Sequence, residues 1–272
     1  MSYYIMYKVV LITGGSSGIG KSIGEFLLDK GFSVYGTSRN PKNYTESKFP
    51  ILALDVTNTE SIENCVKELL AIENRIDVLV NNAGIGITGP IEEIPSIEIK
   101  KSFETNFFGP IEVMKSVIPQ MRKQNSGLII NITSIAGYMG LPYRGIYSAS
   151  KAALEILTEA FRMELKDFNI QMTNIAPGDF ATNIAAGRYH TPVYPSSPYK
   201  ENYSRVLKAI DDDVNKGNNP IGVAQKVYAV INTKHPKIHY KVGAFMQKFS
   251  VVLKFVLPDK LYEKLLLNYY KL

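Results

Sequence analysis

Short apolar runs alternate with longer segments of helical periodicity along this 272-residue chain, and this alternation restricts its fold more than any other feature. The apolar runs, such as KVVLIT, DVLVN and GLIINIT, are nearly continuous. Parallel strands covered by helices on both faces have this composition, whereas strands with one face in water alternate with polar residues. Such strand–helix units connect by right-handed crossovers. We therefore predict an α/β protein with a doubly wound parallel sheet of about seven strands.

The same periodicity gives approximate positions for each element. We expect strands at 7–13, 32–37, 51–54, 77–81, 128–133, 170–175 and 237–240. We expect helices at 19–30, 59–74, 103–124, 147–167, 202–215 and 221–233. An irregular segment with four prolines, 179–220, follows the sixth strand. Residues 244–272 form a C-terminal helical tail whose apolar residues fall on one helical face, namely Phe245, Phe249, Leu253, Val256, Leu261, Leu265 and Tyr269.

Composition excludes several classes of protein. Hydrophobic residues make up 45% of the chain and charged residues 21%, as in a globular domain and unlike a disordered chain. The net charge is +6, but no basic cluster accompanies it, so nucleic-acid binding is not expected. The single cysteine, Cys65, cannot form an intramolecular disulfide. There is no secretory signal and no apolar run long enough to span a membrane, and we expect a cytoplasmic protein.

A glycine-rich segment, TGGSSGIG from Thr13 to Gly20, lies between the first expected strand and helix. Glycine permits the tight turn and lets a pyrophosphate approach the backbone, and the free N–H groups of the following helix face that anion. The spacing Gly14-x3-Gly18-x-Gly20 differs from the common G-x-G-x-x-G fingerprint. A structural turn is the alternative, but its position in the first strand–helix unit favours a phosphate-binding loop.

Five further motifs follow in order: NNAG from Asn81 to Gly84, Asn106, Ser134, YSASK from Tyr147 to Lys151, and PGDFAT from Pro177 to Thr182. With the glycine-rich loop they resemble the short-chain dehydrogenase/reductase family over roughly residues 7–243. The resemblance implies a Rossmann-like fold and an enzyme that interconverts a carbonyl and an alcohol (EC 1.1.1.-) by hydride transfer. A weaker resemblance, through the Thr-Ser-Arg at 37–39 and the overall length, is to the hydroxysteroid and retinol dehydrogenase branch.

The resemblance also assigns the cofactor-binding residues and the domain organisation. The whole chain, 1–272, is expected to be one domain, with 7–178 as the cofactor-binding and catalytic core and 179–220 as a substrate loop. The expected cofactor contacts are Thr13, Gly14, Ser16, Ser17, Gly18, Ile19, Gly20, Ser38, Arg39, Asp55, Val56, Asn82, Ala83, Gly84, Lys151, Pro177, Gly178 and Thr182.

The residues after the second strand indicate which nicotinamide cofactor binds. A carboxylate there would hydrogen-bond the ribose 2′-hydroxyl of NAD, but this chain has Thr37, Ser38 and Arg39. The guanidinium of Arg39 suits a 2′-phosphate, so we predict NADP(H) rather than NAD(H); a surface arginine is the alternative. Asp55, after the third strand, either contacts the adenine or caps the next helix.

Tyr147 and Lys151 are four residues apart, so they share one face of a helix. A neighbouring ammonium favours a phenolate, and a tyrosine in this setting can donate a proton to a carbonyl or accept one from an alcohol. The resemblance adds Ser134, which orients the substrate oxygen, and Asn106, which holds a water in a proton relay with Lys151. The alternatives are a turn serine and a helix kink near Gly109 and Pro110.

The segment 179–220 carries aromatic and apolar residues that suggest a sizeable, partly apolar substrate: Phe180, Ile184, Tyr189, Tyr194, Tyr199 and Tyr203. Arg144 and Arg188 either pair with an anionic substrate group or face water, and water is the expectation. The resemblance implies a homodimer or homotetramer through helices 103–124 and 147–168. The basic, amphipathic tail suits a membrane surface, but packing on the domain or a second subunit is preferred.

Other functions receive less support. A non-catalytic NADP(H)-binding sensor or scaffold would have a damaged catalytic set, whereas this set is complete. A nucleotide-sugar epimerase or dehydratase shares Tyr-x3-Lys, but NNAG, the loop spacing and the short substrate portion argue against it. No metal is expected, since His190, His235 and His239 lack metal-ligand spacing and are expected in loops or at the surface.

Overall fold

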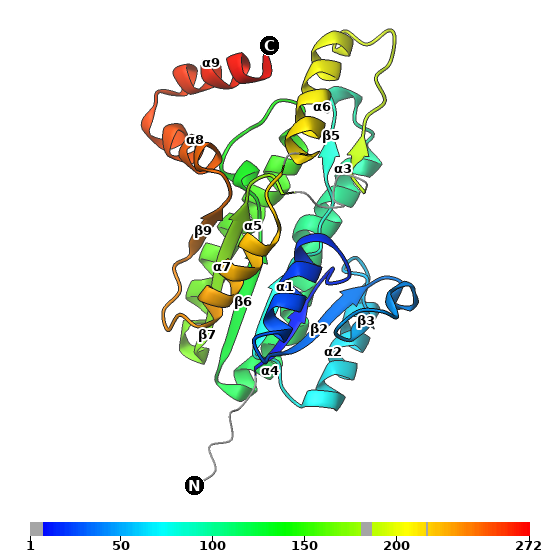
Figure 1. Ribbon diagram of the computed structural model, residues 1–272, viewed down its shortest axis with the longest axis vertical. Helices are drawn as coiled ribbons and strands as arrows, with labels where there is room; N and C mark the ends of the chain where they lie inside the picture. The colour runs from blue at the N-terminus through cyan, green and yellow to red at the C-terminus, as the bar shows by residue number, and fades with distance from the viewer. Residues whose placement is uncertain (1–7, 181–186, 216) are drawn as a thin grey trace.

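The computed structural model describes residues 8–180, 187–215 and 217–272, with the side chains at 213–215 excepted. Seven strands form one parallel sheet in the order β3-β2-β1-β4-β6-β7-β9, which confirms the predicted fold class (Figure 1). The strands are β1 (Val9–Ile12), β2 (Ser33–Ser38), β3 (Ile51–Ala53), β4 (Val78–Asn81), β6 (Gly127–Ile132), β7 (Ile170–Pro177) and β9 (His239–Val242).

Helices cover both faces of this sheet, and alternate residues of each strand pack against opposite layers. Val9 and Leu11 of β1 face α2 (Thr59–Glu73) and α4 (Gly109–Gln124), whereas Val10 and Ile12 face α1 (Gly18–Leu28) and α7 (Ile221–Ile231). All four β1 side chains are therefore fully buried. This two-sided burial is the reason why the strands read as continuous apolar runs.

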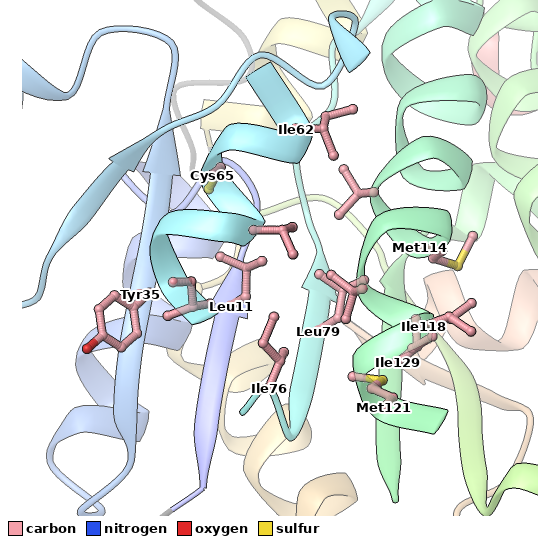
Figure 2. Close-up of a cluster of buried hydrophobic side chains, with 14 of the residues drawn as sticks. Leu11, Tyr35, Ile62, Cys65, Ile76, Leu79, Met114, Ile118, Met121 and Ile129 are labelled. Atoms are coloured by element: carbon pink, nitrogen blue, oxygen red, sulfur yellow. The ribbon is translucent and has the colours of Figure 1, made fainter. Parts of the chain in front are cut away.

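Figure 2 shows the larger of these two cores. Leu11, Leu79 and Ile129, from three neighbouring strands, meet Cys65 of α2 and Met114 of α4. Burial, and the nearby Glu68 charge, raise the pKa of the Cys65 thiol to about 12. Cys65 is therefore a packing residue without thiolate reactivity.

The expected helix at 103–124 is wrong at its start. Its first part is a separate helix, α3 (Ser96–Phe103), which begins after Pro95 and continues through a π-helical turn, η3 (Glu104–Phe108), into α4. The π-helical turn breaks the apolar period of this helical stretch. The sequence therefore predicted the part that contains α4 and missed α3. The other expected elements lie within three residues of their observed bounds, including α5 (Gly145–Glu164).

A second, two-stranded sheet stands beside the main one and was not predicted. It joins β5 (Ile87–Thr88) to β8 (Tyr189–His190), and these strands are too short to show a period. The adjacent helix α6 (Lys200–Asn215) carries Tyr203, whose buried hydroxyl donates to the carbonyls of Thr88 at 3.3 Å and Thr191 at 3.1 Å. These bonds fasten the segment after β7 onto the second sheet (Figure 1).

The tail forms two helices, α8 (Phe245–Val256) and α9 (Asp259–Tyr270), and α9 lies beside α6 (Figure 1). Only part of the expected apolar face packs, because Leu253 contacts the core whereas Phe245 and Val256 are 71% and 72% exposed. Val251 and Tyr262 are buried instead, and the Tyr262 hydroxyl lies 2.8 Å from Met139 Sδ. α8 is apolar on more than one side, so periodicity alone did not identify the face that packs.

Candidate active site

Two adjoining cavities lie at the carboxyl ends of the central strands, where open α/β sheets bind ligands. The larger, of about 540 Å³, runs from the glycine-rich loop along the ends of β2 and β3. The smaller, of about 70 Å³, is lined by Ser134, Tyr147 and Lys151. The cavities share four lining residues: Ile19, Asn82, Gly84 and Ile85. They therefore form one continuous site, in which the larger cavity leads to the smaller one that contains Ser134, Tyr147 and Lys151.

The glycine-rich loop has the geometry of an anion-binding turn. Gly14 and Gly18 have φ angles of 64° and 54°, in the left-handed region that favours glycine. A side chain at Gly20 would bring a Cβ within 2.4 Å of the Gly14 carbonyl oxygen. Among the described residues, the Ser17 side chain makes no capping bond to α1. The first N–H groups of α1 are therefore available to a phosphate at the cavity wall.

Thr13 supports this loop from behind instead of lining the cavity. Its Oγ1 accepts hydrogen bonds from the backbone N–H groups of Asn82 at 2.9 Å and Ala83 at 3.0 Å. The Asn82 side chain returns two bonds, to the carbonyls of Thr13 at 3.0 Å and Gly14 at 3.1 Å. The expected cofactor contact of Thr13 is replaced by a scaffold role, since the residue is 1% exposed.

The other expected cofactor residues divide clearly between the two cavities and the surrounding scaffold. Gly20 lines neither cavity because it packs against the loop itself, and Thr182 lies outside the described residues. The residues that line the large cavity are Gly14, Ser16, Ser17, Gly18, Ile19, Ser38, Arg39, Asp55, Val56, Asn82, Ala83 and Gly84. The residues that line the small one include Lys151, Pro177 and Gly178.

Arg39 and Asp55 stand at the far end of the large cavity. The Arg39 side chain is exposed there, just after β2. Asp55 Oδ1 accepts bonds from the N–H of Thr57 at 2.9 Å and its hydroxyl at 2.8 Å. The helix-cap alternative for Asp55 is wrong, because Asn58 caps α2 and accepts a 2.9 Å bond from the Ser61 N–H.

Tyr147 and Lys151 project from the first turns of α5 into the small cavity. Lys151 is 5% exposed, and its Nζ donates to the Ile132 carbonyl at 3.0 Å. Burial lowers the pKa of Lys151, while the charges of Tyr147 and Glu155 oppose the shift. The ammonium is thus held in place beside the Tyr147 phenol, in a setting where its charge acts strongly.

Ser134 lies two residues after β6, in the small cavity with Tyr147. Its Oγ accepts a 3.2 Å bond from the Ala136 N–H and lies 3.5 Å from the Pro177 carbonyl. It therefore caps the short 3₁₀ helix η4 (Ile135–Tyr138), as the turn alternative expected, and it also faces the cavity. The two roles are compatible. The Ser134 hydroxyl can keep its bond from the Ala136 N–H and give up the weak contact with the Pro177 carbonyl to bind a ligand.

Asn106 sits in the π-helical turn itself, not in a kink at Gly109 and Pro110, which begin α4. Its Oδ1 accepts from the Ile85 N–H at 2.8 Å, and its Nδ2 donates to the Ile85 carbonyl at 2.9 Å. Nδ2 also lies 3.2 Å from the hydroxyl of Ser150, the residue before Lys151. The side chain therefore ties the loop after β4 to α5, and its place in a relay stays a prediction.

Two charged residues that were not predicted to line the site, Arg188 and Asp179, do so. Arg188 lines the small cavity with its side chain only 6% exposed, so the expectation that it faces water is wrong. Asp179 lines the same cavity and accepts a 2.8 Å bond from Gln247 of α8. Asp179 lies in the PGDFAT motif and Arg188 was weighed as an anion partner, but only the pairing of β8 and the packing of the tail show their positions in this cavity.

The expected aromatic lining is mostly wrong. Phe180 lines the small cavity, but Tyr203 of α6 is buried against the second sheet, and Tyr199 makes an edge-to-face contact with Tyr143 instead of entering the site. Tyr194 is 45% exposed. Ile184 lies outside the described residues.

The histidines lie partly where they were expected. His235 is exposed in a loop, but His190 and His239 lie in β8 and β9. In the part of the chain that the structure describes, no cluster of three His, Cys, Asp or Glu residues could hold a metal. Every described helix is too short or too polar to cross a membrane.

Comparison with known proteins agrees with this geometry. A family model described as short chain dehydrogenase matches residues 8–192. The chain is 38% identical to a 3-ketodihydrosphingosine reductase of Bacteroides thetaiotaomicron, with 97% of this chain and 98% of the relative covered. It is 31% identical to an NADPH-dependent 3-dehydrocapnine reductase of Ornithobacterium rhinotracheale, with 95% of each covered.

Solved structures show the same architecture. A short-chain dehydrogenase from Streptomyces avermitilis superposes with a TM-score of 0.84 at 29% identity, covering 97% of both chains. ElxO with NADP bound superposes with a TM-score of 0.69 at 30% identity, covering 87% of this chain and 97% of the other. The chain belongs to the short-chain dehydrogenase/reductase family. It is an oxidoreductase acting on carbonyl or alcohol groups with a nicotinamide dinucleotide cofactor.

Proposed function

We propose that this protein is an NADPH-dependent reductase of a 3-oxo compound with a long apolar chain. The observation that carries the proposal is the set of Ser134, Tyr147 and Lys151 in one cavity, joined to a dinucleotide-sized cavity that ends at Arg39. The substrate class comes from the two relatives, whose names both describe reduction at carbon 3.

The residues around the large cavity suit the cofactor. The backbone of Gly14 to Ile19 would hold the pyrophosphate, and Arg39 would bind a ribose 2′-phosphate by charge-assisted hydrogen bonds. Asp55, the carboxylate that follows β3 in this cavity, already accepts two hydrogen bonds from Thr57, so it is not free to bind the ribose hydroxyls of NAD. This arrangement favours NADP(H) over NAD(H).

The chemistry follows from the small cavity. The bound nicotinamide supplies the hydride to the carbonyl carbon. Tyr147 donates its phenolic proton to the carbonyl oxygen, and Ser134 orients that oxygen through its hydroxyl. Lys151 stabilises the phenolate that remains and holds the cofactor ribose. Asn106 returns a proton to this pair through a water. In the reverse direction the same residues accept the alcohol proton.

The proposed assembly is a homodimer or homotetramer through α4 and α5. Exposed apolar side chains lie on α5, just before α4 and just after α5, which supports pairing across this side of the molecule. These residues, with their exposed fractions, are Phe108 at 47%, Ile156 at 65%, Met163 at 73% and Phe168 at 38%.

The test is the loss of NADPH absorbance with 3-ketodihydrosphingosine presented in detergent micelles, with NADH measured in parallel. Turnover with NADPH, together with a product reduced at carbon 3, would support the proposal. Tight NADPH binding without turnover of this ketone or of shorter 3-oxo analogues would contradict it.

A further inference from the structure

The Arg188 guanidinium is enclosed in the small cavity with Tyr147 and Ser134. Its side chain is 6% exposed. A guanidinium that leaves water needs compensating hydrogen bonds and charges, or the fold is destabilised. The partners of Arg188 therefore decide what this residue is for.

The surrounding protein compensates this charge only in part. The nearest carboxylate oxygen, Asp211 Oδ1, lies 3.8 Å from Nη1, beyond hydrogen-bonding distance, on a side chain that is 47% exposed. Nη1 has no hydrogen-bond partner within the described residues. Burial, and secondarily the charge of Arg144, lower the pKa of Arg188, while Tyr147, Asp211 and Asp179 oppose this shift. A buried donor is thus left open beside the reacting groups.

The backbone holds Arg188 in this position. The next residue, Tyr189, pairs with Ile87 in the second sheet, and its N–H donates to the Gly86 carbonyl at 3.0 Å. A Cβ at Gly86 would lie 2.7 Å from Arg188 Cγ, so the side-chain stem lies against bare backbone. The position is built by two strands and a glycine, which is the kind of support that orients a binding residue.

A second guanidinium reaches the same cavity. Arg144 precedes α5, lines the small cavity, and lies 5.6 Å from the centre of the Tyr147 ring. Two arginines from separate elements therefore flank one phenol. Asp179, the carboxylate of this cavity, is already bonded to Gln247.

We propose that Arg188 and Arg144 form a subsite for a tetrahedral oxyanion, a sulfonate or a phosphate ester, carried by the substrate close to its ketone. Such an anion would accept hydrogen bonds from Nη1 of Arg188. It would also reduce the repulsion between the guanidinium groups of Arg188 and Arg144. The inference rests on the proposed function and narrows it, because it selects 3-oxo compounds with an anionic headgroup over those with a neutral hydroxyl.

Binding without turnover tests the subsite. Calorimetry would measure the Kd of octane-1-sulfonate, octyl phosphate and octan-1-ol for the full-length protein saturated with NADP⁺. We expect at least one anion to bind wild type about tenfold or more tighter than the alcohol, and Arg188→Gln to remove that difference. Whichever of the two anions has the lower Kd identifies the type of headgroup that the subsite prefers. Equal Kd values for all three in wild type, or an unchanged preference in Arg188→Gln, would overturn the subsite.

Two further variants keep this test independent of folding. Arg144→Gln alters a half-buried side chain and should lower the anion preference by itself. Arg122→Gln, at the exposed end of α4 where Arg122 stacks on Phe168, should leave it unchanged. NADP⁺ affinity and the thermal midpoint show whether each variant is folded.

Turnover separates failure of the subsite from failure of the proposed function. The matched pair is 3-ketodihydrosphingosine and its counterpart with a sulfonate in place of the carbon-1 hydroxyl. Preference for the sulfonate in wild type but not in Arg188→Gln supports both proposals. Equal turnover of the pair retains the reductase and rejects the subsite, whereas anion binding with no turnover of either rejects the proposed function alone.

A second and independent observation concerns the tail. We define the outer surface of the tail by the apolar side chains of α8 and α9 that are at least 42% exposed: Phe245, Met246, Val252, Phe255, Val256, Leu261, Leu265 and Tyr269. Five lysines occur within 244–272 against Asp259 and Glu263, a net charge of +3. Such a surface at a symmetric contact between two copies would bring like charges together, whereas an anionic bilayer matches both its features.

We infer that the outer surface of α8 and α9 docks on an anionic lipid bilayer. Gln247 of α8 bonds to Asp179 in the small cavity, so the docked surface begins next to the site. A substrate with a long apolar chain could then pass from the bilayer to the site without crossing water.

Vesicle co-sedimentation tests this inference with phosphatidylcholine alone and with phosphatidylglycerol added. We expect binding that requires the anionic lipid and falls about tenfold or more in the double variant Phe245→Ser, Phe255→Ser. The matched control is the double variant Ile72→Ser, Ile97→Ser, on α2 and α3, whose side chains are 57% and 58% exposed; it should bind as wild type does. No binding by wild type, or loss of self-association in the tail variant by light scattering, would show that the surface contacts a second copy instead.

Discussion

At the scale of single residues, the proposed chemistry depends on groups from separate elements that meet in one small cavity. Lys151 and Tyr147 come from α5, Ser134 from the turn after β6, and Arg188 from the residue before β8. Each is held by backbone contacts, such as the bond from Lys151 to the Ile132 carbonyl. Their effects can therefore be removed one at a time.

Replacing Tyr147 with Phe removes the proton donor and leaves the cavity wall in place. We expect NADPH to bind with unchanged Kd and kcat to fall by about 100-fold or more, as for loss of a general acid. Fluorescence titration and steady-state kinetics measure the two quantities. A kcat near the wild-type value would exclude Tyr147 as the acid.

Arg39→Asp tests the cofactor preference. The change removes a charge-assisted hydrogen bond and places a carboxylate where a 2′-phosphate would bind, so KM for NADPH should rise about tenfold or more. KM for NADH should fall, because a carboxylate can accept bonds from the ribose hydroxyls. Unchanged KM values for both cofactors would show that Arg39 is a surface residue only.

His239 gives a prediction of pH dependence. Its Nδ1 lies 2.6 Å from Glu155 Oε2 and its Nε2 lies 3.0 Å from Glu159 Oε1. The hydrogen bond to Glu155 is the main cause that raises the pKa of His239 above 6.5, against the effect of burial. The stabilisation is therefore complete below pH 6.5 and is lost as pH rises through the higher folded-state pKa.

His239→Gln should consequently lower the free energy of unfolding most at pH 6, by about 2 kcal/mol, and much less at pH 9. Urea unfolding of both proteins at the two pH values measures the difference. An equal loss of unfolding free energy at pH 6 and pH 9 would mean that the hydrogen bond between His239 and Glu155 stabilises the fold without the charge of the histidine.

At the scale of elements, short irregular segments orient side chains of the site that the long helices and strands do not position. The π-helical turn at Glu104–Phe108 turns Asn106 toward Ile85, and the second sheet turns Arg188 toward Tyr147. The glycine-rich loop is the third such segment, and its last glycine, Gly20, leaves the least room for a side chain.

Gly20→Ala tests that contact. The new Cβ would lie 2.4 Å from the Gly14 carbonyl oxygen, so the loop and α1 must separate. We expect a loss of about 1–3 kcal/mol in unfolding free energy and weaker NADPH binding. Gly140→Ala is the control, because its Cβ would meet nothing within 4 Å. Similar stability and cofactor affinity in the two variants would contradict this account of the loop.

At the scale of the whole molecule, two apolar cores clamp the parallel sheet, and the site lies in the crevice at its carboxyl edge. The outer face of α5 carries the exposed apolar side chains of Ile156 and Met163 in the single chain. Ile156→Glu with Met163→Glu places charges there, so we expect the oligomer to dissociate while the monomer stays folded. Light scattering measures the mass, and an unchanged oligomer would place the interface elsewhere.

Much of this organisation was predictable from consecutive residues. Strand and helix periods, the glycine turn and the Tyr147–Lys151 pair are local patterns, so the sequence predicted the fold class, the family and the composition of the site. The start of α3 and the two short strands β5 and β8 were missed, because their periods are broken or too short.

The remaining assignments depended on contacts between distant segments. Arg188 is buried because β8 pairs with β5, and Thr13 is a scaffold residue because Asn82 and Ala83 use its hydroxyl. The tail packs through Val251 together with Leu253, while the rest of the face that its period indicated is largely exposed. The sequence by itself determined which chemical groups the protein has and on which elements they lie. Tertiary structure alone decided which of them are buried together, because burial depends on neighbours that no local pattern contains.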